Sequence, residues 1–83
     1  MTTEKKIYSV DLLYYTEENV PECGAKIFIS TTTDLTKVPK DVLKEDVDVQ
    51  EAMDANDCES IGTVEEISLE EFEFYGDAEL IYM

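Results

Sequence analysis

The chain has 83 residues, of which 21 are Asp or Glu and six are Lys, and it contains neither Arg nor His. Its formal net charge of −15 excludes the basic patch with which nucleic-acid-binding proteins contact phosphates. The absence of His excludes histidine acid–base chemistry and histidine metal ligands. A chain of this length has room for one hydrophobic core, so we expect residues 1–83 to form a single domain.

The first two predicted elements are strands joined as a hairpin. In residues 5–16 the apolar and aromatic residues recur with a period of two, which is typical of a strand. Residues 17–24 contain Asn, Pro and Gly and therefore predict a loop. Residues 25–32 predict a second strand, and the short connection favours antiparallel pairing.

A helical region is expected after the hairpin. Residues 33–41 are rich in turn residues, and Pro39 is a favourable first residue for a helical turn that reaches Lys44. Asp48 and Glu51 fit a capping box, and the apolar residues after Asp48 recur at helical spacing. The sequence therefore predicts a helix over residues 48–56, either separate from the turn at 39–45 or continuous with it.

Residues 68–76 fit two different structures. Ser68 and Glu71 could form a capping box for a helix that stops at Gly76. Phe72 and Phe74, however, alternate with acidic residues as they would in a strand. Of the two structures, we expect a strand here.

The remaining segments complete the expected fold. Residues 60–67 predict a third strand, and residues 78–83 predict a terminal strand. The fold class is therefore expected to be α+β. Its architecture would be an antiparallel sheet of three to five strands with one helix packed on it, in a ββαβ(β)-like order.

The residues that could carry out catalysis or bind a metal do not form a recognisable site. Cys23 follows Glu22, whose carboxylate should raise the pKa of the thiol and make it unreactive. Acidic residues are so numerous that a pair of them does not by itself indicate a glycosidase. Asp54 and Glu65 match the first and last positions of an EF-hand loop, but Glu59 stands where that loop needs Gly. We therefore expect a protein that is not an enzyme and has no metal or cofactor.

The sequence does not predict export or membrane insertion. Ser9 and Asp11 interrupt the apolar run near the N-terminus, so we expect no signal peptide. No apolar run approaches the length of a membrane span. Cys23 and Cys58 are far apart in the sequence, which fits reduced thiols better than a structural disulfide. The expected location is the cytoplasm, and the host cytoplasm if the protein is phage-encoded.

The negative charge is concentrated in the second half of the chain. Residues 1–44 contain all six Lys and have a net charge of −1, whereas residues 45–83 contain 14 acids and no base. Crowded like charges destabilise a compact fold, and a basic partner would offset their repulsion. For any single acid, a solvated position is the alternative explanation. The residues expected to bind the partner are Glu45, Asp46, Asp48, Glu51, Asp54, Glu65, Glu66, Glu70, Glu71 and Glu73.

An array of carboxylates could imitate the phosphates of DNA, which presents about one negative charge per 1.7 Å of helix axis. Such an array would occupy a groove lined with Lys and Arg, and association would be fast and sensitive to salt. Tyr75 and Tyr82 could add aromatic anchors at the centre of the contact. The expected partner is a basic nucleic-acid-binding protein, not nucleic acid or a membrane.

This chain resembles small phage-encoded inhibitors in its length, its acidity and its expected strand order. The resemblance also includes two sequence segments, Val64-Glu65-Glu66-Ile67 and Leu69-Glu70-Glu71-Phe72-Glu73. This group includes anti-CRISPR proteins and DNA-mimic inhibitors of restriction or repair enzymes. The resemblance implies binding to a host nucleic-acid enzyme, such as a CRISPR effector or a nuclease, often by blocking its DNA site. Two alternatives remain open. One is an immunity protein or antitoxin against a basic nuclease, and the other is a structural or assembly module whose acids are simply solvated.

Overall fold

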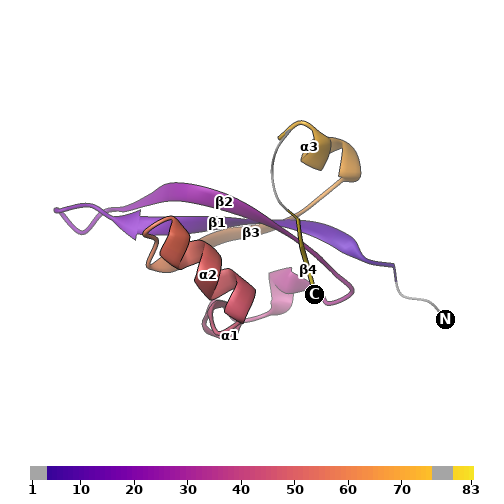
Figure 1. Cartoon of the computed structure of the whole chain (residues 1–83), viewed down its shortest axis with the longest axis horizontal. Helices are drawn as coiled ribbons and strands as arrows, with labels where there is room; N and C mark the ends of the chain where they lie inside the picture. The colour runs from indigo at the N-terminus through magenta and orange to yellow at the C-terminus, as the bar shows by residue number, and fades with distance from the viewer. Residues whose placement is uncertain (1–3, 76–79) are drawn as a thin grey trace.

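A computed structural model describes residues 4–75 and 80–83 (Figure 1). The chain forms four strands, three short α-helices and one 3-10 helix within these residues. In chain order they are β1 (Lys6–Tyr15), β2 (Pro21–Thr31), η1 (Leu35–Lys37), α1 (Lys40–Lys44), α2 (Val47–Ala55), β3 (Ser60–Ile67), α3 (Leu69–Glu73) and β4 (Leu80–Tyr82).

The strands form one sheet in the order β3-β1-β2-β4. β1 is antiparallel to both of its neighbours, whereas β4 is parallel to β2. The expected α+β domain is confirmed, but the sheet is mixed and not wholly antiparallel. The parallel pair arises because the chain crosses from β3 at one edge to β4 at the other through α3.

The main core lies between the sheet and the layer formed by η1, α1 and α2. Tyr8, Val10 and Leu12, which the alternation in the first strand places on one face, are almost completely buried there. Val49 and Met53 of α2 close the core from the other side. Because the apolar side of α2 packs against the sheet, the charged side chains on the opposite side of the helix remain in solvent.

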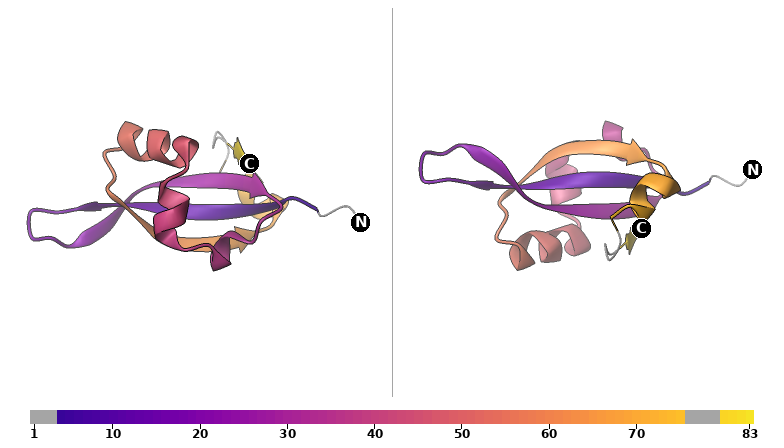
Figure 2. Two further views of the ribbon diagram at one scale, coloured as in Figure 1. Left: turned by 90° about the horizontal axis from the view of Figure 1, so that it is seen from below. Right: turned by 90° about the horizontal axis from the view of Figure 1, so that it is seen from above.

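A second, smaller aromatic cluster covers the opposite face of the sheet. Phe28 of β2 is only 2% exposed, and it lies under Phe72 and Tyr75 from the α3 segment. Figures 1 and 2 show α3 on the side of the sheet opposite to α1 and α2. The expectation of a single helix on one face is therefore incomplete, because the sheet carries helices on both faces.

The expected strand over residues 68–76 is wrong for the part that the structure describes. Residues 69–73 form α3, and the hydroxyl oxygen of Ser68 accepts a hydrogen bond of 3.1 Å from the backbone N–H of Glu71. A helix places Phe72 and Tyr75 on the same side, so both rings reach Phe28, whereas a strand would point them to opposite faces. Gly76, the expected helix stop, lies outside the described residues.

The start of α2 also differs from the expectation. Asp46, and not Asp48, is the N-cap: its Oδ1 accepts hydrogen bonds from the backbone N–H groups of Asp48 and Val49, at 2.9 and 3.2 Å. The two helices α1 and α2 are separate, because Glu45 and Asp46 interrupt them. The expected helical turn after Pro39 is confirmed as α1.

The hairpin of β1 and β2 extends beyond the helical layer as an arm, which we define as residues 13–24 (Figures 1 and 2). The second strand begins at Pro21, so the expected loop over 17–24 is shorter than predicted. Gly24 forms a bulge opposite the Leu12–Leu13 step, and a Cβ there would lie 2.7 Å from the ring of Tyr14. Only a glycine fits this close approach without a shift of the Tyr14 side chain.

The expected strands at residues 60–67 and 78–83 are confirmed as β3 and, within the described residues, as β4 at 80–82. In the part of the chain that the structure describes, no helix is both long enough and apolar enough to cross a membrane.

Candidate partner-binding surface

The ten acids expected to bind a partner form two surfaces and an edge, not one continuous face. The α2 acidic surface and the α3 acidic surface lie on opposite sides of the sheet (Figure 1). Two further acids lie between them on β3, which is an edge strand. The α2 acidic surface consists of Glu45, Asp46, Asp48, Glu51 and Asp54; the α3 acidic surface of Glu70, Glu71 and Glu73; and the β3 edge of Glu65 and Glu66.

The α2 acidic surface is a short row of carboxylates on one helix. Val49 and Met53 face the core, and Asp48, Glu51 and Asp54 are exposed. Residues three apart in an α-helix are about 4.5 Å apart along its axis, so these three carboxylates follow one another at close spacing. The arrangement concentrates negative charge along one side of the domain.

The α3 acidic surface is created by the packing of the aromatic side chains beneath it. Phe72 turns toward the sheet, with its ring centroid 5.2 Å from that of Phe28. Glu70, Glu71 and Glu73 are consequently all exposed. The helix thus holds three carboxylates above the face of the sheet that α2 does not cover.

The β3 edge carries the one acid of residues 45–75 that pairs with a lysine. Lys6 Nζ lies 3.3 Å from Glu66 Oε1, and the hydrogen bond to Glu66 raises the pKa of Lys6 above its ordinary value. Both side chains are more than half exposed, so solvent screens this pair and its contribution to stability is small. Glu65, beside it, is exposed.

Most of the negative charge has no lysine close to it. The other ion pairs of the described residues join Lys26 to Asp11 and Lys37 to Asp34, with N···O distances of 3.4 and 3.9 Å. Both of those acids belong to the first 44 residues. Within residues 45–75, the acids other than Glu66 therefore have no lysine nitrogen within 4 Å and form no ion pair within the chain.

The two tyrosines expected as aromatic anchors are both exposed to solvent but differ in role. Tyr75 is half-exposed, and one side of its ring lies against Phe28, with 4.8 Å between centroids. Lys26 Nζ lies 5.6 Å from the centroid of the Tyr75 ring. Tyr82 on β4 is 69% exposed. Tyr75 thus takes part in the fold, whereas Tyr82 has most of its surface in solvent.

Phe74 is an exposed aromatic side chain that the sequence reasoning missed. It is 88% exposed, the largest value among the large apolar side chains of the described residues. The alternation of Phe72 and Phe74 hid it, because a strand would place the two rings on the same face. The signal that could have found it is the Ser68–Glu71 cap, since a helix separates the two phenylalanines.

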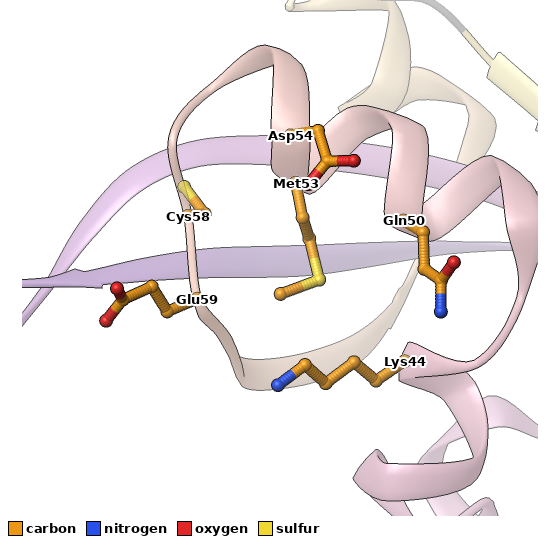
Figure 3. A pocket seen from close by; sticks show the side chains of 6 residues that line it. All are labelled: Lys44, Gln50, Met53, Asp54, Cys58 and Glu59. Carbon is orange, nitrogen blue, oxygen red and sulfur yellow. The ribbon is translucent and has the colours of Figure 1, made fainter.

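A small pocket lies beside the α2 acidic surface (Figure 3). It has a volume of about 230 Å³, and its lining includes the buried residues Met53 and Cys58. Burial raises the pKa of the Cys58 thiol, so it is mostly protonated at neutral pH and is a poor nucleophile. The lining residues are Lys44, Gln50, Met53, Asp54, Cys58 and Glu59.

The acids do not gather into a metal site in the part of the chain that the structure describes. No group of three or more His, Cys, Asp or Glu side chains there could hold a metal ion. Asp54 and Glu65, the end positions of the EF-hand match, lie on α2 and β3 and not in one loop. Both cysteines are free, with Cys23 exposed and Cys58 buried.

Fold and surface together define a small α+β domain with two acidic surfaces on opposite sides of a mixed sheet. Comparison with protein-family models, with curated proteins and with solved structures finds no match to this chain. The functional argument therefore rests on the position of the charges and the exposed aromatic side chains.

Proposed function

We propose that this protein is an inhibitor that binds the cationic nucleic-acid site of a host defence or DNA-processing protein and blocks it by electrostatic mimicry. In this proposal it acts in the cytoplasm, that of the host if a phage encodes it, and it carries out no catalysis. The observation that carries the proposal is the uncompensated charge of residues 45–75, where Glu66 alone has a lysine partner among the described side chains. A basic partner would reduce the repulsion among these acids.

The spacing of the α2 carboxylates supports mimicry of a phosphate backbone. Asp48, Glu51 and Asp54 are exposed on one helix, and each of these three acids lies about 4.5 Å from the next along the helix axis. DNA presents about one charge per 1.7 Å of axis over its two strands, or about one per 3.4 Å on each strand. A lysine- or arginine-lined groove that follows one strand would meet a comparable density of charge on α2.

Acids lie on both sides of the sheet, and this arrangement favours a partner whose binding site is a channel and not a flat surface. A flat partner could contact the α2 acidic surface or the α3 acidic surface, but not both, because the sheet separates them. Duplex DNA also carries phosphates on both of its strands. We therefore expect the target to be a CRISPR effector, a nuclease or another enzyme that encloses its DNA.

The proposal is tested by capture followed by a competition assay. The tagged full-length protein is incubated with bacterial lysate, and bound proteins are eluted by a step of increasing salt. The expected result is recovery of a basic nucleic-acid enzyme whose binding to labelled duplex DNA is lost when the acidic protein is added. Recovery of a partner that binds DNA equally well in its presence would overturn the proposal.

A second candidate function, an assembly module, is favoured by the exposed apolar side chains at Leu69, Phe74 and Tyr82. A module of this kind would form oligomers, and its association would persist after neutralisation of the acids. Analytical ultracentrifugation at low and high salt distinguishes the two, because an electrostatic inhibitor at net charge −15 is expected to stay monomeric. An immunity protein or antitoxin uses the same electrostatics, and capture of a basic nuclease toxin would identify that alternative.

A further inference from the structure

The outer side of α3 combines one exposed aromatic ring with two carboxylates. With 3.6 residues per turn, Glu70, Glu73 and Phe74 fall on the side of the helix opposite to Phe72 and Tyr75. A surface hollow of about 430 Å³ lies beside them, and Glu70, Glu73 and Phe74 line it among the described residues. The ring of Phe74 therefore stands at a hollow whose described lining is otherwise acidic.

The fold does not use the side chain of Phe74. The aromatic contacts between the α3 segment and the sheet come from Phe72 and Tyr75, whose ring centroids lie 5.2 and 4.8 Å from that of Phe28. Phe74, at 88% exposure, buries little surface against the described residues around it. An aromatic ring kept in water gains its hydrophobic free energy only when another molecule covers it.

The charges around Phe74 indicate what kind of molecule covers it. A second copy of this chain would bring Glu70, Glu71 and Glu73 against the same three acids, and like charges in close contact cost several kcal/mol. An anionic lipid surface is repelled in the same way. A protein surface that carries Arg or Lys around an apolar pocket would cover the ring and pair with the carboxylates, and a guanidinium would also stack on the ring.

We propose that Phe74 is the aromatic anchor through which the α3 acidic surface docks on a basic protein surface, in an apolar pocket whose rim carries Arg or Lys side chains. The inference rests on the proposed function for its choice of a basic partner. It adds a specific contact that electrostatics alone does not supply: aromatic side chains at the centre of an interface often carry most of the binding energy.

The test replaces Phe74 of the full-length protein by a photo-crosslinking phenylalanine analogue and irradiates it in bacterial lysate. The matched control carries the same analogue at Val20, which is 47% exposed on the hairpin arm. The partner identified by crosslinking is then purified, and its affinity is measured for the wild-type protein and for the Phe74→Ala and Val20→Ala variants at low and high salt. We expect a basic protein to crosslink at position 74 only, a loss of about tenfold or more for Phe74→Ala, and a change below about twofold for Val20→Ala.

Salt separates the aromatic contact from the charge contact. The loss caused by Phe74→Ala should be similar at both salt concentrations, whereas the loss caused by Glu70→Gln with Glu73→Gln should shrink at high salt. The inference would be overturned if Phe74→Ala bound the partner as tightly as wild type. It would also be overturned by crosslinks that form only between copies of this chain, or by the absence of any crosslink. A basic partner that needs Phe74 but whose DNA binding is unaffected would leave the inference standing and overturn the proposed function.

Discussion

The ring of Phe72 on α3 packs edge-on against the ring of Phe28 on β2, with 5.2 Å between centroids and 70° between planes. This contact, with that of Tyr75, attaches α3 to the face of the sheet that the main core leaves open. It fixes the position of the α3 acidic surface and turns Phe74 toward solvent. Phe72 on α3 therefore has a structural role, whereas Phe74, the C-cap residue of α3, is exposed.

We expect Phe72→Ala to destabilise the domain by about 2 kcal/mol, below the usual loss for a fully buried Phe because this ring is only half-buried. Phe74→Ala, the matched control, should change the free energy of unfolding by less than about 0.5 kcal/mol because it lies on the surface. Urea denaturation followed by circular dichroism measures both. Equal effects of the two substitutions would mean that α3 does not pack as described.

The N-cap of α2 can be tested by alanine substitution at two neighbouring acids. Asp46→Ala removes the acceptor of two backbone hydrogen bonds and should cost about 1 kcal/mol, whereas Asp46→Asn should retain most of the stability. Asp48→Ala, which removes an equal charge without a cap, should cost less than Asp46→Ala. Thermal unfolding of the three variants measures these losses of stability. A larger loss for Asp48→Ala than for Asp46→Ala would mean that Asp46 is not the N-cap of α2.

Alkaline pH should destabilise the fold. Burial raises the pKa of the Cys58 thiol above 9.0 and that of the Tyr8 phenol above 10.0. The folded state then keeps protons that the unfolded state releases, so the free energy of unfolding falls as pH rises through and above 9. Between pH 9 and 10 the fall should be smaller in Cys58→Ala than in the control Cys23→Ala, whose thiol is exposed. Denaturation midpoints at several pH values measure this, and identical slopes would contradict it.

Salt should act in opposite directions on stability and on binding. Added NaCl screens the repulsion among the acids of residues 45–75, so the free energy of unfolding should rise between about 0.01 and 0.5 M. The same screening should weaken the complex with a basic partner. Urea titrations and binding titrations over one salt series provide both slopes. A stability that falls with salt would indicate that ion pairs, and not repulsion, dominate the folded state.

The strands and α1 could be predicted from the sequence because their signals are local. The period-two alternation of residues 5–16 identifies β1, and Pro39 marks the start of α1. The N-cap of α2 could not be assigned reliably, because Asp46 and Asp48 are both suitable residues and the backbone path between α1 and α2 selects the first. The parallel pairing of β4 depends on the crossover through α3, which sequence periodicity does not reveal.

The acids were predictable as a group but their arrangement was not. Their concentration after residue 44 is visible in the sequence, whereas their division between two sides of the sheet depends on the position of α3. Phe28 decides that position, because a helix over residues 69–73 packs the rings of Phe72 and Tyr75 against it together. Phe74 was missed for the same reason: its exposure follows from a tertiary contact made by its neighbours.

Three charge-matched variants test the central claim, that acids at defined positions bind the cationic nucleic-acid site. The first variant, on α2, combines Asp48→Asn, Glu51→Gln and Asp54→Asn. The other two convert three Glu to Gln, at positions 70, 71 and 73 on α3 and at positions 17, 18 and 22 on the hairpin arm. Each variant removes three negative charges and changes the formal net charge from −15 to about −12.

The most direct measurement is the affinity of each variant for the captured target, by competition with labelled duplex DNA. The expected result is a loss of about tenfold or more for the α2 and α3 variants and of less than about threefold for the arm variant, since close charge pairs are worth more than distant screened ones. Equal losses in all three would show that net charge alone drives binding and would contradict the assignment of the two acidic surfaces.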